Sequence, residues 1–126
     1  MNIKGVVIHH SASDDVSANE INRWHKNRGW NGIGYHFVVR QSGLIEPARE
    51  WSIAGAHKKG YNDTHLGICA TGNFTKEYPT NKQIDSLIML VGGILNRNNG
   101  GEILQHHSNC PGPNFPWKYF IKNIRR

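Results

Sequence analysis

The chain has 126 residues, of which 37% are hydrophobic and 19% are charged. This length and composition are typical of one soluble globular domain, residues 1–126, that buries its core without disulfide support. Two cysteines are too few for a disulfide framework, which excludes the small disulfide-stabilised classes. Lysine and arginine outnumber aspartate and glutamate by 15 to 9, and this excess favours an anionic partner: a cell wall, a nucleic acid or a membrane surface.

Neither export nor membrane insertion is expected from the sequence. Residues 1–8 contain no long apolar segment followed by a cleavage site, so we predict no signal peptide. No run of about 18 apolar residues is present, so we also predict no membrane-spanning segment. The protein should therefore be made in the cytoplasm, and it would act elsewhere only if another agent released it.

The first part of the chain predicts a strand and then a helix. The short β-branched run at residues 3–8 predicts a buried strand that leads directly into His9. Ser17 and Glu20 have the spacing of a capping box, in which each side chain bonds the backbone N–H of the other residue. A helix should therefore begin there and end near residue 29.

A hairpin is predicted next, with strands at residues 35–40 and 44–46 joined by a turn at 41–43. Side chains alternate between the two faces of a strand. The expected faces are Tyr35, Phe37 and Val39 on one side, and His36, Val38 and Arg40 on the other.

The second half of the chain continues the alternation after a long loop. Residues 47–65 show no helix or strand pattern, and loops that carry aromatic and histidine side chains on a rigid scaffold often bind ligands. The elements expected after it are a strand at 66–71, a helix from a capping box at 80–83 to about 96, a strand at 103–104 and a short helix after Trp117. Because strands alternate with helices, the fold class is a single α/β domain.

Two imidazoles and one thiol lie within five positions at His106, His107 and Cys110. Closely spaced histidine and cysteine residues are common zinc ligands, but a site needs a further ligand from elsewhere. His9 supplies it, because the carboxyl end of a central strand is where open α/β sheets bind ligands. Two histidines and one thiolate leave one coordination position open, which is the pattern of a catalytic zinc ion and suits amide hydrolysis. Tyr35 is the best candidate for an acid/base or transition-state donor.

Two other interpretations explain less of the sequence. A hydrolase with Cys110 as the nucleophile would leave His9 without a role. A nucleic-acid-binding domain would need its basic residues on one face, and it would leave the histidines and Cys110 unexplained. Cys69 lies in an apolar run and is expected to be an inert core thiol.

Five segments in register resemble one family of enzymes. They are Ile8-His9-His10-Ser11-Ala12-Ser13, Ile21 to Lys26 with Gly29-Trp30, Gly34 to Val39, Gly55 to Asn62 followed by Leu66 to Cys69, and Cys110-Pro111-Gly112. The chain resembles, from about residue 3 to 120, the N-acetylmuramoyl-L-alanine amidases, which include the phage lysozyme-type amidases and the animal peptidoglycan recognition proteins.

The resemblance implies a zinc hydrolase, with one zinc ion per chain, that cuts the amide between N-acetylmuramic acid and the L-alanine of the peptidoglycan stem peptide. It would be an endolysin-like, bacteriolytic enzyme that reaches the cell wall after release. The implied fold is a central mixed β-sheet flanked by helices, with the zinc in a surface cleft. The partner would be peptidoglycan, bound by a monomer without nucleic acid or membrane insertion.

The resemblance also assigns residues. His9 and Cys110 would be the first and last zinc ligands, and Tyr35 the catalytic tyrosine. The implied substrate-binding residues are His57, which would line the groove, and Trp30, Trp51 and Tyr61 as stacking surfaces.

The segment before Cys110 departs from the family. It is shorter than in phage amidases, and Ser108 stands where they carry a lysine that stabilises the transition state. The shortening leaves His106, or alternatively His107, as the second ligand. A peptidoglycan-binding module without activity is the other function that the resemblance allows; Cys110 favours the enzyme, because binding-only members typically lack this cysteine.

Overall fold

Five strands form one mixed sheet at the centre of residues 1–125, the part of the chain that the computed structural model describes. The strands are β1 (Gly5–His10), β2 (Phe37–Val39), β3 (Ile45–Pro47), β4 (His65–Ala70) and β5 (Glu102–Gln105), in the spatial order β3-β2-β4-β1-β5. β1 pairs in parallel with both β4 and β5, β2 pairs in parallel with β4, and β3 is antiparallel to β2. The expected mixed sheet is confirmed.

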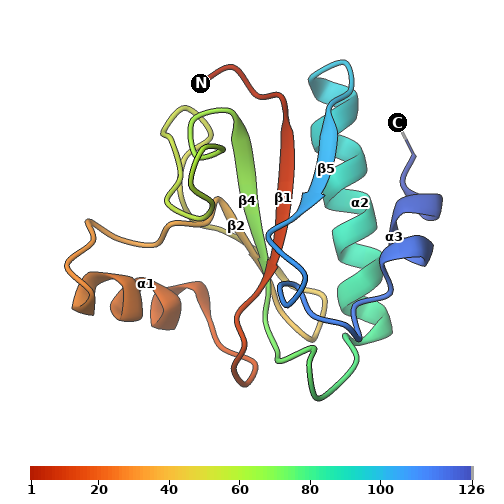
Figure 1. Cartoon of the computed structure of the whole chain (residues 1–126), viewed down its shortest axis with the longest axis horizontal. Helices are drawn as coiled ribbons and strands as arrows, with labels where there is room; N and C mark the ends of the chain where they lie inside the picture. Colours follow the sequence, from red (N-terminus) through yellow and green to blue (C-terminus); the bar gives the residue numbers. More distant parts are fainter. Residues whose placement is uncertain (126) are drawn as a thin grey trace.

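Helices cover both faces of the sheet (Figure 1). α1 (Ala18–Asn27) packs on one face, while α2 (Asn81–Arg97) and α3 (Trp117–Asn123) pack on the other. The strands β1, β2 and β4 are short and buried over their whole length, as strands with both faces covered should be.

Alternation along the strands divides the core in two. Val6 and Ile8 of β1, and Leu66 and Ile68 of β4, face α2 in the larger cluster. The smaller cluster, on the α1 face, contains Ile21, Val38 and Cys69. The smaller cluster therefore leaves room on its face for polar side chains, and His9 lies there.

The predicted faces of the second strand are correct for residues 36–39 but wrong for Tyr35. Phe37 and Val39 pack in the larger cluster, whereas Tyr35 packs beside Val38 in the smaller one. The reason is that β2 begins only at Phe37, so the two-residue period does not extend back to Tyr35. This placement turns the tyrosine towards the face that carries His9.

The first capping box forms only in half. The Ser17 hydroxyl accepts a hydrogen bond from the Glu20 N–H at 3.2 Å, as predicted. The Glu20 carboxylate, however, does not reach back to Ser17: it accepts from the indole N–H of Trp24 at 3.0 Å and pairs with Arg23. Glu20 therefore stabilises the helix surface instead of its first backbone N–H.

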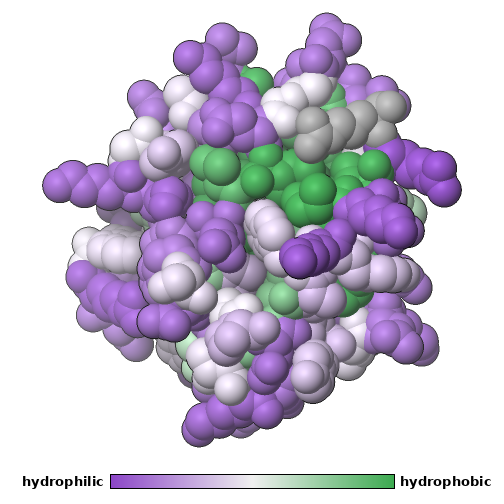
Figure 2. Space-filling view, turned by 45° about the vertical axis from the view of Figure 1, so that its right-hand side comes forward, coloured by the Kyte–Doolittle hydropathy of each residue, from purple (hydrophilic) through white to green (hydrophobic). Residues whose placement is uncertain are grey.

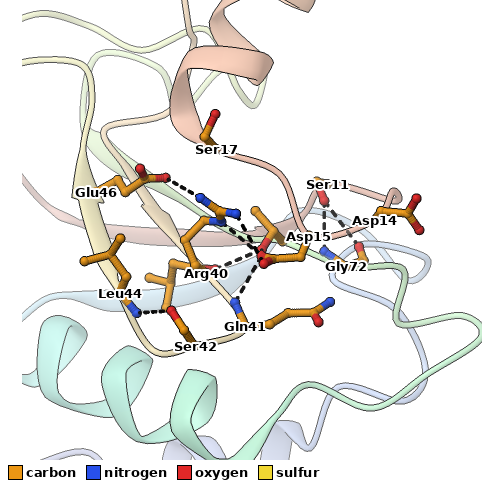
Figure 3. A network of polar contacts seen from close by, with 12 residues as sticks. Ser11, Asp14, Asp15, Ser17, Arg40, Gln41, Ser42, Leu44, Glu46 and Gly72 are labelled. Atoms are coloured by element: carbon orange, nitrogen blue, oxygen red, sulfur yellow. Dashed lines mark hydrogen bonds and ion pairs between the residues drawn. The ribbon is translucent and has the colours of Figure 1, made fainter.

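The loop between β1 and α1 is held by a polar network around Asp15 (Figure 3). The Arg40 guanidinium donates to both carboxylate oxygens, at 3.0 and 3.2 Å, and the Thr71 hydroxyl donates at 2.6 Å. Burial alone would raise the pKa of Asp15, but the hydrogen bonds from Arg40 and Thr71 hold it below its ordinary value. The network ties the segment that follows His9 to the ends of β2 and β4.

On the side of the molecule that carries α2 and α3, Figure 2 shows hydrophobic side chains gathered in one patch within a mostly hydrophilic surface. Partly buried side chains of these helices and of β5 pack against the larger core cluster, among them Ile88, Ile103 and Ile121, and Ile124 joins them directly after α3. None of the helices within residues 1–125 combines the length and the apolar character that a membrane crossing requires.

Candidate metal centre

The fold brings together one nitrogen of His9, one nitrogen of His106 and the sulfur of Cys110, all within 4.8 Å of one another. His9 lies near the carboxyl end of β1 and is 1% exposed. His106 follows β5 directly, and its N–H donates to the carbonyl of Ile8 at 3.2 Å. Two adjacent parallel strands therefore deliver the two imidazoles to the same edge of the sheet.

The register of β1 and β5 selects His106 over His107. Ile8 pairs with Gln105, so His9 and His106 are the next residues along the two strands and project to the same face. His107 is exposed, and its Nδ1 accepts from the N–H of Asn109 at 3.1 Å. His107 therefore lies outside the cluster, although it lines the same pocket.

A tight loop returns Cys110 to the two histidines. His107 and Cys110 exchange backbone hydrogen bonds of 3.0 Å, and the Cys110 sulfur accepts from the N–H of His10 at 3.4 Å. Burial raises the pKa of this thiol to about 11, while the His10 N–H and the charge of Lys58 lower it. Without a metal the thiol stays protonated at neutral pH and is a weak nucleophile, which argues against a cysteine hydrolase. A bound cation would deprotonate it.

His9 is held in its neutral form. Burial lowers its pKa well below the ordinary value, and the neighbouring His57 and His106 lower it further. Its Nε2 lies 3.0 Å from Nδ1 of His57, whose Nε2 lies 3.0 Å from the carbonyl oxygen of His65. A neutral imidazole is the form that binds metals.

Tyr35 stands over the cluster. The centroid of its ring lies 5.0 Å from that of His9, and the residue lines the same pocket as the three donors. Burial raises the pKa of the phenol well above its ordinary value, and Cys69 and Cys110 raise it further. Tyr35 therefore keeps its proton at neutral pH and is able to donate a hydrogen bond. The predicted burial of Cys69 is confirmed, since it is 0% exposed.

The cluster opens into a pocket of about 370 Å³. Two of the predicted substrate-binding residues, Trp30 and His57, line it, and its walls also include His10, His25 and Arg28. A larger hollow of about 630 Å³ lies between the start of α2 and α3, but its lining contains neither histidine nor cysteine. The smaller pocket is therefore the candidate site, because it contains the histidines and Cys110.

Two residues of this wall were not assigned from the sequence. His25 is buried, and its Nδ1 accepts from the N–H of Gly34 at 2.9 Å, which fixes the loop in front of Tyr35. Arg28 places its guanidinium 5.8 Å from the centre of the Trp30 ring. For His25, the sequence signal is a histidine on the apolar face of α1. For Arg28 the sequence holds no such signal, because it resembles any other surface cation.

Trp51 and Tyr61, the other two predicted stacking surfaces, lie outside the lining of this pocket. Trp51 packs on the α2 side of the sheet: its ring meets Phe37 edge to face, and the Arg97 guanidinium lies 5.5 Å from its centre. It fills space between the loop and the larger core cluster. Tyr61 does not line the pocket either; its ring contacts His65, and the Lys58 ammonium lies 5.2 Å from its centre.

Lys58 places a positive charge next to the cluster. Its ammonium donates to the carbonyl oxygen of His106, and its charge lowers the pKa values of His9 and His106. Ser108, the residue at the position of the family's lysine, has no lysine beside it in sequence. Lys58 reaches the backbone of His106, two residues before Ser108, from the loop that also carries His57.

A family model described as N-acetylmuramoyl-L-alanine amidase matches residues 1–113. The chain therefore belongs to this amidase family.

Individual relatives agree with this assignment. The endolysin of Enterobacteria phage K11 is 34% identical over 118 residues, which cover 88% of this chain and 78% of the endolysin. The solved structure of the N-acetylmuramoyl-L-alanine amidase LysC from Clostridium intestinale URNW superimposes with a TM-score of 0.93 at 36% identity, over 100% of this chain and 88% of that one. Peptidoglycan-recognition protein SC2 of Drosophila melanogaster is 31% identical over 124 residues, 86% of this chain and 67% of that protein.

Proposed function

We propose that this chain is a zinc-dependent N-acetylmuramoyl-L-alanine amidase in which His9, His106 and Cys110 hold one zinc ion. The observation that carries the proposal is the convergence of two imidazole nitrogens and one sulfur within 4.8 Å at the floor of an open pocket. This donor set suits zinc better than magnesium or calcium, which prefer oxygen ligands. Three protein donors leave a position free for catalysis.

The reaction would be hydrolysis of the amide between N-acetylmuramic acid and L-alanine. When bound, a zinc ion polarises the amide carbonyl and activates a water molecule as the nucleophile. Tyr35 keeps its proton and donates a hydrogen bond to the oxygen on which negative charge develops. Trp30, which is 41% exposed, and Arg28 beside it give the pocket a flat apolar surface and a positive charge for sugar rings and substrate carboxylates.

Peptidoglycan is the substrate that best fits the pocket and the charge. The chain carries a net charge of +6, which would attract it to an anionic cell wall. The phage relatives are named endolysins. We infer that this chain acts on the cell wall, as a monomer, after release from the cell that makes it.

The test is to incubate the purified protein with peptidoglycan, with and without a chelator, and to identify the new termini. Amidase activity releases stem peptides with a free L-alanine amino group, and the chelator should abolish the release. Binding of peptidoglycan without any release would favour the non-catalytic module instead.

The ligand assignment is tested by metal content. His106→Ala should lose stoichiometric zinc, whereas His107→Ala, the matched change one residue away, should keep it. Zinc retained by His106→Ala and lost by His107→Ala would overturn the proposed ligand set.

A further inference from the structure

His57 lies between a proposed metal ligand and the backbone of β4. Its Nδ1 is 3.0 Å from Nε2 of His9, and its Nε2 is 3.0 Å from the carbonyl oxygen of His65. His57 is absent from the set of converging donors. Its ring nitrogens are both engaged within the protein, so binding substrate is not its main contact.

The directions of these two hydrogen bonds follow from chemistry. A carbonyl oxygen only accepts, so the proton on His57 must be on Nε2. The ring is packed against β4 and Gly67, and within residues 1–125 no carboxylate contacts it to hold a second proton on Nδ1. Nδ1 of His57 therefore accepts, and Nε2 of His9 must donate. His9 is left with an unprotonated Nδ1.

Asn62, Gly55 and Gly67 also hold His57 in place. The side-chain oxygen of Asn62 accepts from the N–H groups of His57 and Lys58, at 2.7 and 2.9 Å. The ring lies on Gly67, where a Cβ would come within 2.6 Å of the His57 Cγ, and against Gly55, where a Cβ would come within 2.5 Å of the Cδ2. Neither glycine adopts a positive φ, so both are needed for the space they leave, and this packing keeps the His57 ring in one place.

We propose that His57 is a positioning residue that holds His9 in the tautomer with a proton on Nε2 and thereby presents Nδ1 to the metal. The proposal rests on the zinc site proposed above. It differs from the role in lining the substrate groove that the family resemblance implied. Partners of this kind fix the orientation and raise the basicity of a metal-bound histidine, and their loss typically weakens metal binding by about 10–100-fold.

The first test is spectroscopic and uses the metal-free wild-type protein with ¹⁵N-labelled histidine. Long-range ¹H–¹⁵N correlations report which ring nitrogen carries the proton. His9 should show a single neutral tautomer with the proton on Nε2, and His57→Phe, which cannot accept a hydrogen bond, should give a mixture. A proton on Nδ1 of His9 in the wild-type protein would overturn the proposal.

The second test measures the zinc dissociation constant by competition with a chromogenic chelator. His57→Phe should bind zinc about 10–100-fold more weakly. His57→Asn should recover much of this loss, because its side-chain oxygen can accept at the place of Nδ1. If His57→Asn is as weak as His57→Phe while keeping the native fold, His57 contributes packing alone and the proposal fails.

Leu87→Ala is the control for general destabilisation. Leu87 is fully buried in α2, on the opposite face of the sheet. It should lower the unfolding midpoint without changing zinc affinity. Wild-type protein that binds no zinc would refute the proposed metal site itself, whereas equal affinity in wild type and His57→Phe would refute only the role of His57.

Discussion

Gly67→Ala should destabilise the protein by pushing on the His57 ring. The added Cβ would lie 2.6 Å from Cγ, 2.7 Å from Cδ2 and 2.9 Å from Nδ1 of His57, closer than real contacts allow. The ring cannot move away easily, because Gly55 and the His65 carbonyl hold its other side. Overpacking of this kind costs about 1–3 kcal/mol, and the stiffer unfolded chain returns about 0.4–1 kcal/mol. The expected net loss is about 0.5–2 kcal/mol.

Urea unfolding of the metal-free protein measures this loss, and zinc competition measures its effect on the site. Gly93→Ala is the matched control: Gly93 lies inside α2 and an added Cβ meets nothing within 4 Å. That variant should be about 0.5–1 kcal/mol more stable than wild type, because alanine favours helix, with unchanged zinc affinity. If Gly67→Ala were as stable as Gly93→Ala and bound zinc like wild type, the tight packing of the His57 ring on Gly67 would be refuted.

Three further outcomes are expected. Tyr35→Phe should keep its zinc, because Tyr35 is not among the converging metal donors. Its kcat should fall by about 10²–10³-fold, as when one hydrogen bond to an oxyanion is lost. Loss of the metal would instead show that Tyr35 has a structural role. The metal-free protein should lose stability as the pH falls from 6.5 to about 4, because the unfolded state protonates His57 near pH 6.5 but the folded state only at about pH 4. The free energy of unfolding should fall by about 3 kcal/mol over this range. A urea midpoint that stays constant would contradict this expectation. Lysis of cell walls should decrease with added salt, because the net charge of +6 is screened, and a salt-independent rate would exclude charge-driven binding.

The elements were predictable because their signals are local. Buried apolar runs define β1 and β4, and the Ser17 and Thr80 hydroxyls cap the two longer helices as expected. The face of Tyr35 and the packing of Trp51 were not predictable from sequence periodicity. The first depends on where β2 begins, and the second on which side of the sheet the long loop crosses.

The choice between His106 and His107 shows the same limit at the metal centre. Adjacent residues at a strand end project to opposite faces, so the composition of the motif cannot decide between them. The register does: Ile8 opposite Gln105 puts His106 beside His9. That register arises from pairing between segments almost 100 residues apart, and so it is a property of the fold that the short motif itself cannot carry.

His57 carries the argument one step further from the ligands. Its motif marks it as a functional residue, but its partners, His9 and the His65 carbonyl, become apparent only when the loop closes over β4. The clue in the sequence is Gly67, a glycine inside an otherwise apolar buried strand, which marks the close approach of another group. The approaching group is an imidazole, and it lies diagonally beside His9 on the same face of the sheet. Gly67 therefore supports the proposed metal site by leaving the space that the His57 ring occupies.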